Sequence, residues 1–201
     1  MLEAWRPFSA AFDIFFALEA ATDSTLDRLA KDNTVGQTLE AVKVARRYGF
    51  GVTGNFVIDP DWDEDDFKRL WAFVKEHGLQ RAGYTIHTPL PGTPYYDSVR
   101  DRIRAADWAQ FDMSHLLWEP KLGVERFFEL YCETWRRSVL NLSGSKKWWQ
   151  WIGQVQPRNA VVLARALLRT QRMMDPQYYL KEHRLGPAAP PAATRDALRA
   201  R

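Results

Sequence analysis

Three short apolar segments, separated by stretches with helical periodicity, constrain the fold of this chain more than any other feature of its sequence. The segments are 12–18 (FDIFFAL), 50–58 (FGVTGNFVI) and 81–88 (RAGYTIHT), and their branched and aromatic residues favour buried strands. Between them, apolar residues recur with a period near 3.6 residues. Crossovers of this length join parallel strands by right-handed connections. The sequence therefore predicts an α/β fold with three parallel strands.

Capping residues and glycines set the expected helix limits. Thr34 is a cap for a helix that ends at Gly49, and the acidic run 63–66 suits the positive end of a helix over 63–77. Further helices are expected over 22–30, 94–104, 122–141, 146–155 and 157–174. We expect an α/β segment over 1–120, a helical extension over 121–185 and a disordered Pro/Ala-rich tail over 186–201.

Charge and cysteine content narrow the class of protein. Residues 1–120 carry 13 Lys and Arg against 19 Asp and Glu, whereas 121–201 carry 15 against 6, so the second part is basic. The single cysteine, Cys132, excludes an internal disulfide and indicates a reducing, cytoplasmic compartment. No stretch of 18 apolar residues and no signal peptide are present. The sequence also lacks GxxxxGK[ST], which gives no support to a P-loop site.

Polar residues follow each predicted strand. Glu19 ends the first, Asn55 lies in the second, Asp59 ends it, and His87 is near the end of the third. The carboxyl ends of parallel strands share one edge, where reactive groups collect. Glu19, Asp59 and His87 would suit an acid–base hydrolase or a divalent metal site. Helix capping by Asp59 and an ordinary edge histidine at His87 are the alternatives.

An aromatic and basic stretch in the second part suggests a membrane contact. Lys146, Lys147, Trp148, Trp149 and Trp151 are the residue types that favour a membrane–water interface. The alternative is a helix pair packed on the sheet with a solvated basic face. No nucleic-acid-binding motif accompanies the basic residues, so nucleic acid is not an expected partner.

Several segments together resemble one enzyme family. They are FALEAATDSTL (16–26), KDNTVGQTLEA (31–41), YGFGVTGNFVIDP (48–60), TPLPGTPYY (88–96) and LYCETWRRSVLNL (130–142). In register over about 12–140, they resemble the C-terminal half of a radical S-adenosylmethionine (radical SAM) enzyme of the cobalamin-binding type. Within that group they are similar to the hopanoid C-3 methylases. The resemblance implies half of a partial (β/α) barrel, with the three predicted strands as its fourth to sixth.

The resemblance implies an S-adenosylmethionine site at the strand ends. Glu19 would contact the ribose or amino-acid part, Val57 and Ile58 would support the adenine, and backbone groups of His87 and Thr88 would meet it. Asn55 would belong to the same site. One departure concerns the turn after the second strand, where Asp59 stands in place of the family's glycine. Side-chain contacts at that turn are therefore in question.

A larger departure is the absence of the family's cluster-binding loop. The resemblance implies a four-iron cluster held by Cys-x₃-Cys-x₂-Cys and a cobalamin domain, and this sequence has neither those cysteines nor an upstream segment. We therefore expect a C-terminal piece of a methyltransferase acting on a hopanoid-type membrane lipid, inactive without its N-terminal half. An open half-barrel would leave Phe15, Phe56, Val57 and Ile86 without partners on one side. A non-catalytic membrane-associated module and the small hydrolase are the other hypotheses.

Overall fold

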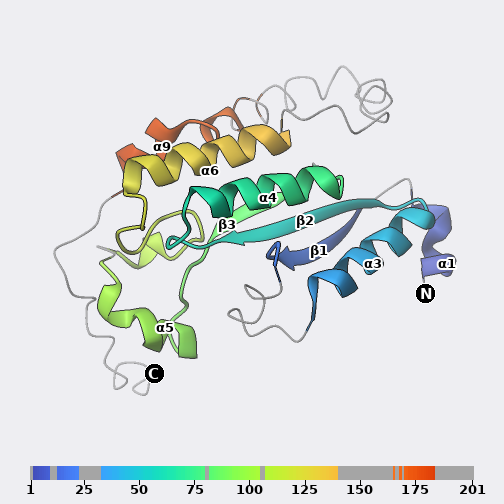
Figure 1. Ribbon diagram of the computed structural model, residues 1–201, viewed down its shortest axis with the longest axis horizontal. Helices are drawn as coiled ribbons and strands as arrows, with labels where there is room; N and C mark the ends of the chain where they lie inside the picture. The colour runs from blue at the N-terminus through green and yellow to red at the C-terminus, as the bar shows by residue number, and fades with distance from the viewer. Residues whose placement is uncertain are drawn as a thin grey trace.

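The centre of the molecule is a three-stranded parallel sheet. The computed structural model describes residues 2–9, 13–22, 33–79, 82–104, 107–139, 165, 168 and 170–183. Strands β1 (Asp13–Glu19), β2 (Gly51–Ile58) and β3 (Gly83–Ile86) follow one another across the sheet in chain order, as Figure 1 shows. The predicted α/β class and parallel strands are thus confirmed.

Helices α3 (Val35–Arg47) and α4 (Glu64–Glu76) begin at the predicted caps. Thr34 accepts a hydrogen bond from the Gln37 backbone N–H, and the Gln37 side chain accepts one from the Thr34 backbone N–H. Asp63 and Asp66 form the same reciprocal capping box at α4. Each box satisfies two backbone N–H groups that have no acceptor within the helix. The local sequence signals therefore fix both helix starts.

Replacing Thr34 with alanine is expected to lower the free energy of unfolding by about 1 kcal/mol, since the Gln37 N–H loses its acceptor. Urea unfolding followed by circular dichroism measures this change. Gln37→Ala is the matched comparison, because it keeps the Thr34 cap and removes only the returning bond. An equal cost for the two variants would show that the Thr34 hydroxyl does not cap α3.

One face of the sheet is covered by helices. Consecutive strands joined by right-handed crossovers place their helices on the same side, and the core confirms this arrangement. Alternate side chains of all three strands point into that core with the inner faces of α3 and α4. The core includes Leu18, Val42, Ala45, Val52, Phe56, Ile58, Phe67, Leu70, Val74, Tyr84 and Ile86. These residues supply most of the burial that holds the sheet and the two helices together.

The residues of opposite parity form a second surface, which we call the open face. Its members are half-buried or exposed, and Phe15 is 63% exposed. The open face consists of Asp13, Phe15, Ala17, Thr53, Asn55, Val57 and Thr85. The expectation that Phe56 and Ile86 also lack partners was wrong. Both are fully buried on the covered face, because strand side chains alternate and each lies one residue away from an open-face position.

Two further helices pack outside α4 (Figure 1). Helix α6 (Val124–Val139) contacts α4 and β3, and α9 (Pro176–Glu182) lies on α6 with the Phe128 and Tyr179 rings stacked 5.0 Å apart. The sequence analysis missed α9, although Asp175 followed by Pro176 is a usual helix start. In the described ranges, no helix is long and apolar enough to cross a membrane.

Short elements complete the described chain. They are α1 (Leu2–Trp5), the 3₁₀ turns Arg6–Phe8, Arg100–Arg102 and Trp108–Gln110, and α5 (Pro94–Val99). Other predictions lie outside the described residues: the helix over 22–30, the helix over 146–155, most of the helix over 157–174, and the tail from 186. The interfacial residues Lys146, Lys147, Trp148, Trp149 and Trp151 also lie there.

Candidate functional site

Strand β1 ends in an irregular residue at the carboxyl edge of the sheet. Glu19 has a φ of +58°, and the pairing register with β2 shifts between Ala17 and Glu19. A bulge of this kind interrupts the alternation of side chains and re-aims the last one. A left-handed conformation is uncommon for a residue that is not glycine and is found where the surrounding structure requires it. The carboxylate predicted for the site therefore lies at a specialised strand end.

Asn55 is the most informative polar residue of the open face. Its side-chain N–H donates to the Thr85 hydroxyl at 3.2 Å, which links β2 and β3 across this face. Within the described residues, no donor is hydrogen-bonded to its amide oxygen. This oxygen lies beside Gly83, where an added Cβ would approach it to 3.0 Å. Gly83 thus leaves space around a fixed acceptor. This group can accept a hydrogen bond from a ligand on the open face.

Just beyond β3, two of the predicted residues are held by specific contacts. The His87 backbone N–H donates to the Ile58 carbonyl at 2.8 Å, and its ring stacks on Tyr95 with centroids 4.0 Å apart. The Thr88 hydroxyl donates to the Ile86 carbonyl at 3.1 Å. These contacts order the backbone at the end of β3. The His87 contact places that residue next to the end of β2.

The two apolar residues predicted for the site lie on different faces. Val57 is half-buried on the open face, where it can contact a ligand. Ile58 is fully buried on the covered face, and its carbonyl already accepts the His87 N–H. A supporting role for Val57 therefore stays a prediction. The Ile58 side chain points away from the open face, so it serves the core.

Asp59 has a local structural role. Its carboxylate accepts the Asp61 backbone N–H at 2.9 Å, and the helix-capping role considered for it belongs to Asp63. In the part of the chain that the structure describes, no three His, Cys, Asp or Glu side chains gather in a way that could hold a metal ion. The described residues therefore give no support to a metal-dependent hydrolase built on Glu19, Asp59 and His87.

The carboxyl edge of the sheet is stabilised by ion pairs that were not predicted from the sequence. The Arg102 guanidinium donates two hydrogen bonds to the Asp61 carboxylate, with N–O distances of 2.6 and 2.7 Å. The same guanidinium lies 5.0 Å from the centre of the Trp118 ring. The hydrogen bonds from Arg102 hold the pKa of Asp61 below its usual value. The two partners are 41 residues apart in sequence. Because no local pattern marks such a pair, the sequence carries no signal for it.

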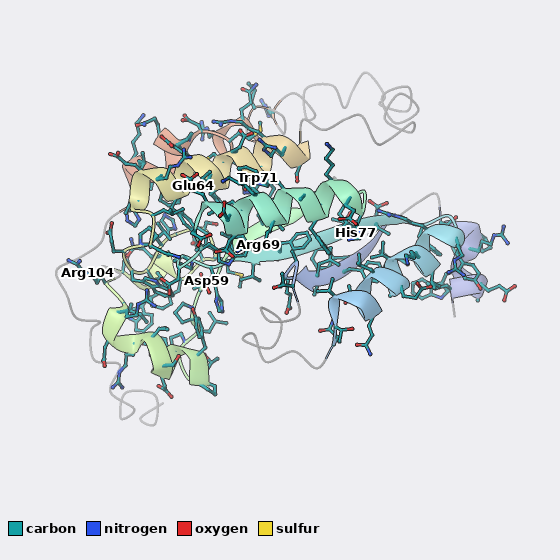
Figure 2. All side chains as sticks on the ribbon, viewed as in Figure 1. Asp59, Glu64, Arg69, Trp71, His77 and Arg104 are labelled. Carbon is teal, nitrogen blue, oxygen red and sulfur yellow. The ribbon has the colours of Figure 1, made fainter. Side chains whose placement is uncertain are left out.

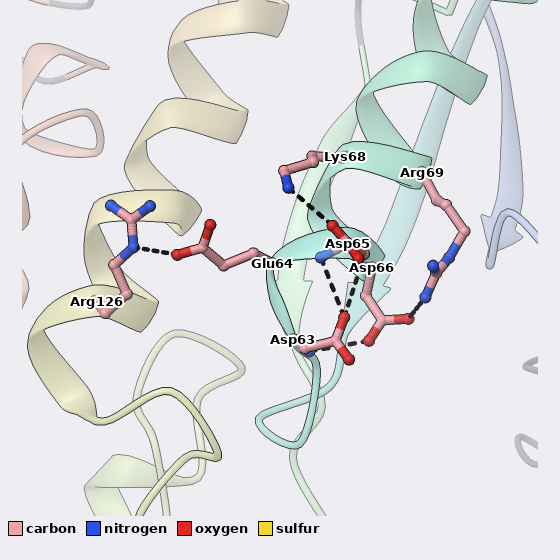
Figure 3. A network of polar contacts seen from close by, with 7 residues as sticks. All are labelled: Asp63, Glu64, Asp65, Asp66, Lys68, Arg69 and Arg126. Atoms are coloured by element: carbon pink, nitrogen blue, oxygen red, sulfur yellow. Dashed lines mark hydrogen bonds and ion pairs between the residues drawn. The ribbon is translucent and has the colours of Figure 1, made fainter.

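The acidic start of α4 forms a second brace, drawn in Figure 3. Glu64 accepts a hydrogen bond from Arg126 of α6 at 2.8 Å, and Arg69 binds Asp66 within α4. A hydrogen bond from Lys121 is the main cause that lowers the pKa of Asp63 to about 2. The labelled side chains of Figure 2 place Asp59 and Glu64 toward one end of α4 and His77 at the other. The acidic run is therefore structural.

His115 also takes part in a local contact. Its Nδ1 lies 2.9 Å from the Asp112 carboxylate, and the same carboxylate accepts the His115 backbone N–H. Its Nε2 lies 4.0 Å from Glu182 of α9. The histidine thus connects the loop beside β3 to α9.

Cys132 is buried in α6 with no exposed surface, and burial raises the pKa of its thiol to about 12. A cluster ligand must be a thiolate that the metal can reach, and three such ligands are needed for the loop the resemblance implies. The cysteine of this chain therefore does not fit an iron–sulfur cluster.

We expect native Cys132 to be protected from thiol reagents. At pH 8 its thiolate population is on the order of a thousandfold below that of an exposed cysteine, and packing also blocks access. Labelling with a chromogenic disulfide is measured with and without guanidinium chloride. The reaction should be slow in the native chain and complete within the mixing time when unfolded. Fast labelling of the folded chain would contradict the buried position.

The described residues form a parallel α/β sheet with helices on one face, and in such folds functional groups collect at the carboxyl edge of the sheet. Comparison with known proteins narrows this class. No family model matches the chain. It is 28% identical to bacteriochlorophyllide d C-12(1)-methyltransferase of Chlorobaculum tepidum over 81% of its length, and 22% identical to hopanoid C-3 methylase of Methylococcus capsulatus over its full length. An uncharacterized methyltransferase of Pyrococcus horikoshii is 32% identical over 49% of the chain.

These relatives confirm the resemblance to methyltransferases of the radical SAM type, with hopanoid C-3 methylase among them. The chain spans 35% of the Chlorobaculum protein and 40% of the Methylococcus protein. The barrel of that family is not itself confirmed by the three described strands. The comparisons leave the roles of Glu19, Asn55, Val57, Ile58, His87 and Thr88 as predictions.

Proposed function

We propose that this chain forms the part of a radical SAM methyltransferase that faces S-adenosylmethionine, and that the assembled enzyme methylates a hopanoid-type membrane lipid at C-3. The observation that carries the proposal is the open face. Among the residues that the structure describes, helices cover only the other side of the sheet, and this side presents Asn55, Val57 and Thr85 close to the carboxyl edge. The methyltransferase relatives support the same assignment.

The residues of the open face fit S-adenosylmethionine. The free amide oxygen of Asn55 can accept from an amino or hydroxyl group of the ligand, and Val57 offers an apolar contact for a flat ring. Glu19 at the β1 bulge can pair with the ammonium group or the ribose hydroxyls. S-adenosylmethionine, when bound, supplies the methyl and radical chemistry of the family. The role proposed for these side chains is to bind and orient it.

The other groups of the family must be held by residues outside this chain. The sequence has one cysteine, which is buried in α6. The resemblance assigns none of the residues of this chain to cobalamin binding. We therefore propose that a cluster-bearing segment completes the barrel against the open face and the exposed edge of β1. The length of the relatives supports this view, since the chain matches 35% and 40% of them.

The choice of substrate rests on a comparison between two relatives. The hopanoid C-3 methylase matches the full length of this chain, including the region after α6, whereas the bacteriochlorophyllide enzyme matches 81% of it. The basic, Trp-rich residues 146–151 also suit an enzyme whose substrate lies in a membrane. Both arguments favour the lipid.

Two chimaeric enzymes test the proposal. In each, residues 1–201 replace the matching region of one relative, either the Methylococcus hopanoid C-3 methylase or the Chlorobaculum bacteriochlorophyllide methyltransferase. The chimaeras are produced in strains that make the corresponding unmethylated substrate, and products are identified by mass spectrometry. We expect 3-methylated hopanoid from the first chimaera and no methylated pigment from the second.

The controls separate the class of enzyme from the choice of substrate. Each parent enzyme in the same strain shows that substrate and cofactors are present, and cluster absorbance shows that each chimaera is assembled. Activity of the pigment chimaera alone would overturn the hopanoid substrate and keep the methyltransferase class. Assembled chimaeras that methylate neither substrate would contradict the proposed function.

A further inference from the structure

A cleft of about 300 Å³ lies between α4 and α6, away from the open face. It is lined by the last turns of both helices and by Tyr84 at the amino-terminal end of β3. Figure 2 shows Trp71, one of its walls, between the two helices. The carboxyl edge of the sheet, with Asp59, lies at the other end of the strands. The cleft is therefore separate from the site proposed for S-adenosylmethionine.

Three basic residues line this cleft. Lys75 comes from α4, and Arg136 and Arg137 come from α6. The Arg137 guanidinium lies 4.1 Å from the centre of the Trp71 ring, and its Nε donates to Glu133 at 2.8 Å. Arg136 donates to the Met174 carbonyl at 2.6 Å. Both arginines are thus fixed in place, which reduces the entropy lost when they bind a ligand.

Lys75 is available to a ligand, since within the described residues no carboxylate lies within ion-pair distance of its ammonium group. Glu133 is the acidic group that faces the two arginines, so the cleft keeps a net positive charge. Cations in the last turn of a helix stabilise its negative end. That effect explains each residue separately, but it does not explain why basic residues of two helices line one cleft.

The apolar walls add a second requirement. Trp71, Val74 and Tyr84 face the same space. The Trp71 ring is oriented by a hydrogen bond from its Nε1 to the Thr134 hydroxyl at 2.8 Å, and the Tyr84 hydroxyl is hydrogen-bonded to Ser138. Two fixed aromatic walls beside convergent cations suit a ligand that joins a compact anion to a carbon skeleton.

We propose that this cleft binds the phosphate group of a phosphorylated ligand, either an anionic phospholipid headgroup or a soluble phosphate ester. The arginine forks and the Lys75 ammonium group would bind the phosphate oxygens, and the aromatic walls would contact the adjoining carbons. The inference does not depend on the proposed methyltransferase function, because it rests on other residues at another part of the fold.

Two probes distinguish the sources of phosphate. Glycerol phosphate is titrated into the full chain by calorimetry at low salt, and the chain is co-sedimented with vesicles of phosphatidylcholine containing phosphatidic acid. Lys75→Gln and Arg137→Gln should each weaken binding about fivefold, since each removes one partly exposed contact to the anion. Lys68→Gln is the matched control on α4, because Lys68 binds Asp65 and lies outside the cleft.

The outcomes are decisive in both directions. Binding of both probes with the expected losses identifies a general phosphate site, and the same losses with vesicles alone identify a lipid headgroup site. Absence of binding to either probe overturns the proposal, as does binding that Lys68→Gln weakens as much as Lys75→Gln does. Circular dichroism verifies that each variant is folded. Lys75 is exposed on α4, so its substitution leaves the core intact.

Discussion

Phe56→Ala is expected to lower the free energy of unfolding by about 3–5 kcal/mol, the range for removing a large aromatic side chain from a packed core. Phe56 has no exposed surface, and its ring contacts Phe73 of α4 edge-on and Tyr84 of β3 face to face, with centroids 6.0 and 6.1 Å away. The variant leaves a cavity between the sheet and the helix layer. Urea unfolding measures the loss, as a lower midpoint with a similar slope.

Phe15→Ala is the matched control on the other face of the same sheet. Phe15 is 63% exposed, so its removal should change the free energy of unfolding by at most about 0.5 kcal/mol. The comparison therefore tests whether Phe15 is as exposed, and Phe56 as buried, as the described part of the chain has them. A loss at Phe15 as large as that at Phe56 would show that the open face is covered in the folded chain.

The same two phenylalanines show what the sequence could and could not predict. The strands were found because apolar runs between helical patterns are a local signal. The face of each residue was not found, since Phe15 and Phe56 have the same chemistry and lie in equally apolar runs. Their faces depend on the parallel register, which pairs Phe15 with Thr53. Phe56 lies an odd number of residues from Thr53 along β2, so its side chain points to the opposite face of the sheet. Register is set by contacts between strands about 40 residues apart.

Helix starts could be predicted from the local sequence, whereas contacts between distant residues could not. The starts of α3 and α4 were predicted from the cap Thr34 and the acidic run 63–66, and the structure adds a capping box to each, formed by residues three positions apart. The Asp61–Arg102 pair and the packing of α9 on α6 bring together residues that are distant in the sequence, and no local pattern marks them. For the candidate site, the predicted strands placed Glu19 and His87 at strand ends and Asn55 within the second strand, where the structure also has them, while their roles stay predictions. The inward position of Ile58 depended on parity and could not be read locally.

Asn55→Leu in the active chimaera is expected to reduce the rate of methylation about 10- to 100-fold. The substitution keeps the approximate volume of the side chain and removes both its hydrogen bond to Thr85 and the free oxygen that we assign to S-adenosylmethionine. An unmet hydrogen bond in a closed site costs on the order of 1–3 kcal/mol, which corresponds to this range of rates. Mass spectrometry of methylated product over time, at several S-adenosylmethionine concentrations, measures the effect.

Thr53→Val provides the control for this variant because it lies on the same strand and the same face, two residues toward the amino end. Thr53 donates to Asp13 at 3.2 Å, so its replacement also removes one hydrogen bond between strands. If Asn55 acts only by joining β2 to β3, both variants should lose stability and activity to a similar small degree. If Asn55 binds S-adenosylmethionine, its variant should raise the S-adenosylmethionine concentration needed for half-maximal rate, and Thr53→Val should stay within about twofold of the parent. Equal behaviour of the two variants would remove Asn55 from the site and leave Glu19, at the end of β1, as the polar side chain proposed to bind S-adenosylmethionine.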